Sequence, residues 1–104
     1  MTERIKKLKE FLKASPADSF LQHALALEYI KLGNDAEARH LFETILTTNP
    51  AYIGSYYHLA KLLEKMNDTP LAMEWYQKGM AAAQAASDMH AYNELRAAYE
   101  ELSF

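Results

Sequence analysis

The chain has 104 residues, half of them hydrophobic, and a formal net charge of −3 at pH 7. A chain of this length accommodates one hydrophobic core, its apolar content argues against disorder, and its small charge indicates no nucleic-acid or membrane partner. There is no cysteine and no apolar run near the roughly 20 residues of a membrane span, so we predict a soluble cytoplasmic protein without disulfides or thiolate metal sites.

Six helices are predicted from apolar residues that recur every three or four positions. Glycine and proline are scarce, three of each, and they lie between these periodic segments. No segment alternates as a strand does, so we expect none. The expected helices span about 3–14, 18–32, 35–48, 52–66, 70–85 and 88–102. The last boundary contains neither glycine nor proline, so one long helix from 70 to 102 is the alternative.

Polar residues mark the expected helix starts. Asn34, followed three residues later by Glu37, has the pattern of a cap whose side chain accepts a free backbone N–H. Elsewhere a candidate cap precedes a proline that suits the first helical turn. These pairs are Ser15-Pro16, Asn49-Pro50 and Thr69-Pro70. For the last helix, only Ser87-Asp88 suggests a start.

The sequence contains an internal repeat. Pro16 recurs as Pro50, and the polar break at 33–35 recurs at 67–69 with the same offset. A helix–turn–helix unit of about 34 residues, with matching residues, resembles the tetratricopeptide repeat. The matching residues are Leu25, Ala26, Tyr29, Ala38, Phe42 and Pro50, then Tyr56, Leu59, Ala60, Leu63, Ala72 and Tyr76. Gln22 departs from the pattern where an aromatic residue is expected, and Gln84 where a proline is expected.

The resemblance implies an all-α fold, a right-handed superhelical array of antiparallel helix pairs, or α-solenoid. Residues 1–104 then form one domain, with repeats at 17–50 and 51–86, a capping half-repeat at 1–16 and a capping helix at 87–104. Capping elements are expected because a repeat array exposes apolar faces at its ends. The side chains expected to face inward from the caps are Leu8, Phe11, Leu12, Tyr92, Leu95, Tyr99 and Leu102.

No arrangement of residues in the sequence indicates catalysis, a cofactor or a metal. The four histidines, at positions 23, 40, 58 and 90, fall on four different predicted helices, with no pair at metal-ligand spacing on one helix face. Glycine-rich phosphate loops and nucleophile motifs are absent. Trp75, at its helical spacing, is expected to be a core residue. We therefore predict a non-enzymatic protein.

The resemblance also implies where a partner binds, because the first helices of successive tetratricopeptide repeats line a concave groove that takes a peptide or a partner's helix. Residues four apart share a helix face, which defines three rows of groove-facing side chains. The predicted groove residues are Phe20, His23, Leu27, Lys31, Tyr57, His58, Lys61, Lys65, His90 and Asn93. Aromatic surface flanked by lysines suits an apolar peptide that carries a carboxylate.

The uneven distribution of charge favours a second role as the alternative. Positions 1–14 carry five basic and two acidic side chains, whereas positions 88–104 carry four acidic and one basic. Opposed charges of this kind predict attraction between the two ends of different molecules. The alternative function is therefore a self-assembly or scaffold module, a weak homo-oligomer or part of a larger complex joined through its end helices.

Overall fold

A computed structural model describes residues 2–103 of the chain, so Met1 and Phe104 of the predicted domain lie outside the described residues. Within them the structure contains six helices and no strand. The helices are α1 (Glu3–Ala14), α2 (Ser19–Lys31), α3 (Asp35–Thr48), α4 (Gly54–Lys65), α5 (Thr69–Ala85) and α6 (Met89–Ser103). Every bound lies within two residues of its predicted position.

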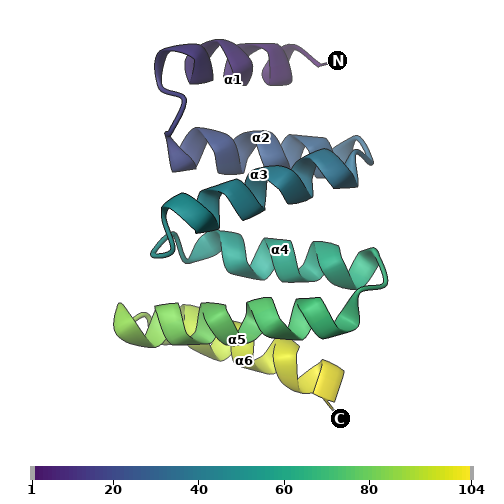
Figure 1. Cartoon of the computed structure of the whole chain (residues 1–104), viewed down its shortest axis with the longest axis vertical. Helices are drawn as coiled ribbons and strands as arrows, with labels where there is room; N and C mark the ends of the chain where they lie inside the picture. The colour runs from purple at the N-terminus through teal and green to yellow at the C-terminus, as the bar shows by residue number, and fades with distance from the viewer. Residues whose placement is uncertain (1, 104) are drawn as a thin grey trace.

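The helices stack in chain order along the long axis of the molecule, whose extents are 41 × 29 × 19 Å (Figure 1). Neighbours in sequence run antiparallel and pack on one another, as in the pairs α2–α3, α4–α5 and α5–α6. The two ends of the chain lie at opposite ends of the stack. The predicted all-α solenoid of helix pairs is confirmed.

Left-handed turns end α2, α4 and α5. Gly33, Asn67 and Ser87 have φ angles of 79°, 63° and 57°. In each turn the N–H of the next residue donates to the carbonyl five residues earlier, at 2.9, 2.9 and 2.8 Å. This bond satisfies a carbonyl that the helix end would leave free. The turn at Ser87 separates α5 from α6, so the alternative of one helix from 70 to 102 is wrong.

Aspartate side chains cap three of the helices. Asp18, Asp68 and Asp88 each accept a hydrogen bond from the backbone N–H three residues later, at 3.1, 3.3 and 3.1 Å. A carboxylate is favoured at this position because the helix N-terminus carries a partial positive charge. The start predicted at Ser87-Asp88 is confirmed, with Asp88 as the cap.

The other predicted caps are wrong in detail. Asn34 precedes α3, but its side chain makes no capping hydrogen bond. Three further candidates do not cap. The helices after Ser15 and Asn49 begin later than the proline pattern implied, and α5 begins one residue earlier, at Thr69 itself. Pro70 does lie in the first turn of α5, whereas the other two prolines lie in turns ahead of their helices.

Small residues lie where paired helices approach one another. Ala26, Ala38, Ala60 and Ala72 are fully buried, and a larger side chain at these contacts would separate the helices. Phe42 and Tyr76 are the largest of the fully buried side chains, and they belong to the continuous core that runs between the pairs. This core holds the first helices of the repeats in fixed positions along one face.

The end helices cover the core largely as expected, with one exchange of residues on α1. On α6, Leu95 is buried, and Tyr92, Tyr99 and Leu102 are partly buried. On α1, Ile5 and Leu8 are buried and Leu12 is partly buried, since they share the face towards α2. Phe11 lies at the edge of that face and is 59% exposed, so its predicted inward position is wrong.

Candidate functional site

A hollow of about 820 Å³ opens between α1, α2 and α4, and we call it the α2–α4 hollow. Five of the ten predicted groove residues line it, namely Phe20, His23, Leu27, Lys31 and His58. Arg4, Ala24, Glu28, Ile30 and Tyr52 complete its wall. The row expected along α2 therefore lies together on one concave surface, with α4 opposite it.

His23 and His58 meet at the centre of this surface. Their ring centroids are 5.2 Å apart, with one ring edge towards the face of the other. His23 Nδ1 lies 2.8 Å from Oγ of Ser55, which is fully buried, and Phe42 packs against both rings. This contact was not predicted from the sequence, because the two histidines lie on different helices, α2 and α4, and have no spacing in common on one helix.

Burial keeps both of these rings neutral. It lowers the pKa of His23 to about 4, with a smaller contribution from repulsion by His58. Burial also lowers the pKa of His58, an effect that the carboxylate of Glu94 partly opposes. At pH 7 each ring therefore offers one N–H donor and one acceptor nitrogen, and adds no charge to the centre of the surface.

A cluster of three charges lies at one end of the α2–α4 hollow. The side chain of Glu28 is only 11% exposed, and its Oε1 lies 2.6 Å from Nε of Arg4 and 3.5 Å from Nζ of Lys31. Both cationic side chains are otherwise exposed. Because two cations share one carboxylate, this end of the hollow has a net positive charge.

A smaller hollow of about 210 Å³ lies between α4 and α6, and we call it the α4–α6 hollow. It is lined by Ile53, Gly54, Tyr57, His58, Asp88, Ala91, Glu94 and Leu95. His58 lines both hollows, so they lie next to one another, and we call the two together the groove. Asp88, which precedes α6, and Glu94 on α6 give the groove two carboxylates. The predicted residues His90 and Asn93 are exposed on that helix outside the lining.

The two lysines predicted along α4 are engaged within the protein. Lys61 Nζ lies 3.6 Å from a carboxylate oxygen of Glu64 and 5.7 Å from the centroid of the Tyr57 ring. Lys65 Nζ lies 3.3 Å from Asp35, at the start of α3. The positive charge of the groove is therefore concentrated near α1 and the end of α2.

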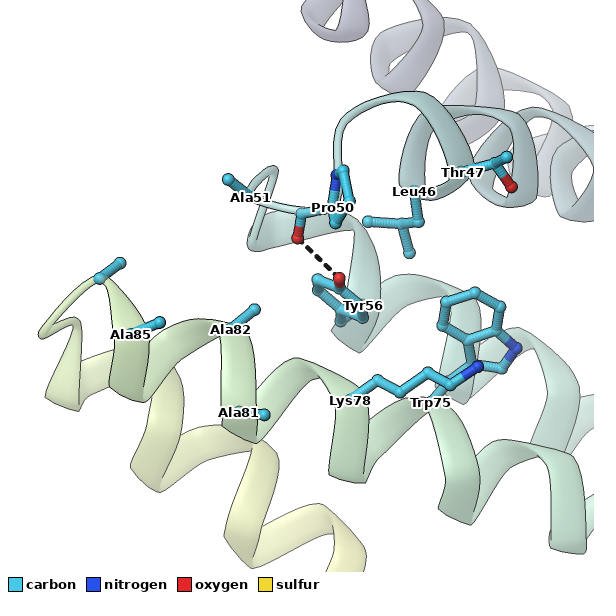
Figure 2. A pocket seen from close by; sticks show the side chains of 11 residues that line it. Leu46, Thr47, Pro50, Ala51, Tyr56, Trp75, Lys78, Ala81, Ala82 and Ala85 are labelled. Atoms are coloured by element: carbon cyan, nitrogen blue, oxygen red, sulfur yellow. Dashed lines mark hydrogen bonds between the residues drawn. The ribbon is translucent and has the colours of Figure 1, made fainter.

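A further hollow, of about 870 Å³, lies between the second helices α3 and α5 and was not predicted (Figure 2). Trp75 is partly buried and packs against the core, as expected, but it also forms one wall of this hollow, with Lys78 Nζ 4.6 Å from its ring. Figure 2 shows alanines of α5 along the floor. They lie on the last turns of α5, where Ala81 and Ala85 are exposed and Ala82 is partly buried.

The described residues contain no cluster of metal ligands, since no three histidine, aspartate or glutamate side chains among them come together. Across residues 2–103, none of the helices has the length and hydropathy needed to span a membrane. What the groove offers is an extended surface, positive at one end, aromatic in the middle and negative at the other.

Comparison with known proteins identifies related chains. The profile of the tetratricopeptide repeat family matches residues 29–99. The crystal structure of a tetratricopeptide repeat domain protein from Salinibacter ruber is 36% identical, with a TM-score of 0.79 over 83% of this chain and 96% of that one. No curated protein matches the chain.

More distant structures share the fold alone. The solution structure of a protein from Bordetella parapertussis is 23% identical and has a TM-score of 0.84, over 99% of this chain and 90% of that one. The crystal structure of MamA is 16% identical, with a TM-score of 0.68 over 95% of this chain and 66% of that one. The fold is therefore shared where sequence identity is low.

Proposed function

The chain belongs to the tetratricopeptide repeat family, whose domains generally bind other proteins and are generally non-catalytic, and we propose that it binds a peptide or helix of a partner protein in the groove along α2, α4 and α6. The proposed function requires neither an enzymatic step nor a cofactor.

The α2–α4 hollow carries this proposal. It gathers side chains that a partner can contact, and Phe20 at its rim is 69% exposed. An exposed large apolar side chain beside a concave surface is typical of a binding site. The apolar, aromatic and charged groups of the hollow come from three helices held by the core, so the surface is preformed.

The alternative, assembly through the end helices, is less well supported. Arg4 occupies the position one repeat period before Ala38. When α6 is aligned with α4 so that Tyr92 matches Tyr56, Arg96 of α6 matches Ala60 of α4. Both arginines are exposed at places where the repeats have buried alanine. Arg4 turns towards Glu28 of α2, 2.6 Å away, and neither arginine offers the apolar contact that a further helix would need, which favours closed ends.

Affinity capture from the lysate of the native host, followed by titration of the captured segment as a synthetic peptide, tests the groove. We expect Phe20→Ala to weaken binding and Ala81→Glu, in the hollow of Figure 2, to leave it unchanged. If the segment binds Phe20→Ala normally and loses affinity for Ala81→Glu, the contact lies between α3 and α5 and the proposal is wrong.

A further inference from the structure

We propose that the groove selects a partner segment with an acidic group at one end, apolar side chains in the middle and a basic group at the other end. The acidic end would lie between α1 and α2, and the basic end between α4 and α6. This inference rests on the groove function proposed above and adds the chemistry and the direction of the bound segment.

Arg4 and Lys31 form the proposed site for the acidic group. Their shared partner, Glu28, is largely buried and already contacts both cations, so it neutralises only one of the two charges. A guanidinium has five N–H donors, and the contact with Glu28 leaves several of them free. A carboxylate from a partner can therefore bridge the exposed Arg4 and Lys31 side chains at the mouth of the α2–α4 hollow.

The middle of the groove accepts apolar side chains. Phe20, Leu27 and Tyr52 line the α2–α4 hollow, whose volume of about 820 Å³ accommodates more than one side chain. His23 and His58 lie beside them as neutral rings that contact one another. Charged groups of a partner would lose water here without gaining an opposite charge, so this part favours aliphatic or aromatic residues.

Glu94 and Asp88 form the proposed site for the basic group. Both line the α4–α6 hollow, whose volume of about 210 Å³ suits one side chain. One oxygen of Asp88 accepts the N–H of Ala91 at 3.1 Å, and its second oxygen is not used in that bond. A lysine or arginine tip between the two carboxylates would gain opposite charges on both sides.

The sign of the charge also changes along a row of residues that occupy equivalent positions on α2, α4 and α6. Lys31 of α2 and Lys65 of α4 occupy equivalent positions in the two repeats, and the residue that aligns with them on α6 is Glu101. Lys65 is paired with Asp35, whereas Lys31 shares the single carboxylate of Glu28 with Arg4, so the net charge is positive at the α2 end of the row and negative at Glu101 on α6. A segment with one sign of charge throughout would be repelled at one end, and repulsion of this kind creates specificity.

Three synthetic peptides with one apolar core test the selection. The first has an acidic and a basic end, the second has two acidic ends and the third has two basic ends. We expect fluorescence anisotropy at about 0.05 M salt, where charges are weakly screened, to show tenfold tighter binding of the first peptide. Glu94→Lys should shift the preference to the second peptide, and Lys31→Glu to the third.

Glu74→Lys is the matched control, because it changes the net charge as Glu94→Lys does but lies exposed on α5 outside the groove. A shift in preference with Glu74→Lys equal to that with Glu94→Lys would overturn the proposal, since it would reflect net charge alone. If all three peptides bind equally and Phe20→Ala abolishes their binding, the groove function is supported and the charge selection is rejected. Binding of none of them up to millimolar concentration, by a chain with a helical circular dichroism spectrum, would contradict both.

Discussion

Gln22 and Tyr56 donate equivalent hydrogen bonds in successive repeats, although their side chains differ. Nε2 of Gln22 lies 3.0 Å from the carbonyl oxygen of Pro16, and the hydroxyl of Tyr56 lies 2.6 Å from that of Pro50. In both cases the acceptor is the proline six residues earlier. Gln22 departs from the family pattern in residue type, but it keeps the bond that ties the turn to the first helix of the repeat.

Removing the hydroxyl of Tyr56 should lower the stability of the second repeat. We expect Tyr56→Phe to lower the free energy of unfolding by about 1 kcal/mol, the usual net value of one hydrogen bond, in a urea titration. Tyr57→Phe is the control, since its hydroxyl makes no hydrogen bond among the described residues. Equal losses in the two variants would mean that the bond to Pro50 adds nothing to stability.

Enlarging the alanines between paired helices should also destabilise the fold. Ala38 and Ala72 are fully buried, so leucine at either position must push the helices of a pair apart. We expect a loss of about 1–3 kcal/mol in denaturant titration. Ala85→Leu, at an exposed position near the end of α5, should change stability little. A similar loss at all three positions would contradict the repeat register.

The helices and the repeat could be predicted because their signals are local. Apolar spacing identified all six helices, and buried alanines such as Ala26 and Ala60 marked the close helix contacts. The cap at Asp18 was missed, since several polar residues precede α2 and only the path of the chain selects one. Phe11 was placed inward by its residue type, but the helix phase carries it to the edge of the buried face.

The groove could be predicted only in part. The α2 row from Phe20 to Lys31 follows from helical spacing, and four of its members line one hollow. The pairing of Lys65 with Asp35, and the meeting of His23 with His58, depend on how adjacent helices are rotated about their axes. A one-dimensional pattern does not contain that rotation.

Stability should fall in mild acid because His23 is buried as a neutral ring. Its pKa is lowered from 6.5 to about 4 in the folded chain, so the unfolded chain binds a proton first as the pH falls. The contribution of this ring to the free energy of unfolding is therefore largest above about pH 6.5. It decreases between pH 6.5 and 4 and does not change further below pH 4. Because the ring is partly exposed, we expect only about 1 kcal/mol, measured by urea titration across this range.

Two histidine variants separate this contribution from those of other groups. His23→Gln should flatten the pH dependence between pH 6.5 and 4, leaving the smaller contribution of His58, whose pKa burial also lowers. His40→Gln, at an exposed position on α3, should preserve it. An unchanged pH dependence in His23→Gln would show that the ring is not the group responsible.

The ends of the stack should resist self-association. We expect sedimentation of the natural chain to show a monomer at low salt and at about 0.5 M salt, where charges more than a few ångströms apart are screened. Arg4→Ala with Lys7→Leu places on α1 the residues found one period later at Ala38 and Leu41. This variant should associate through an apolar surface that salt does not weaken.

Lys13→Leu adds an equal apolar side chain on another face of α1, and it should not promote this association. Self-association of the natural chain at low salt that disappears at about 0.5 M would instead support end-to-end assembly through opposite charges. In that case the exposed arginines at the two ends do not act as caps.

Phe20 and Phe11 offer a matched comparison for the groove, because they are 69% and 59% exposed and only Phe20 lines the α2–α4 hollow. Aromatic side chains at the centre of a contact commonly contribute most of its binding energy. We therefore expect Phe20→Ala to weaken the tightest-binding synthetic peptide about tenfold, and Phe11→Ala to leave its affinity unchanged. Neither variant should change the melting temperature by more than about 2 °C, since both rings are mostly exposed. Loss of affinity in Phe11→Ala alone would place the peptide on the outer face of α1 and refute the groove.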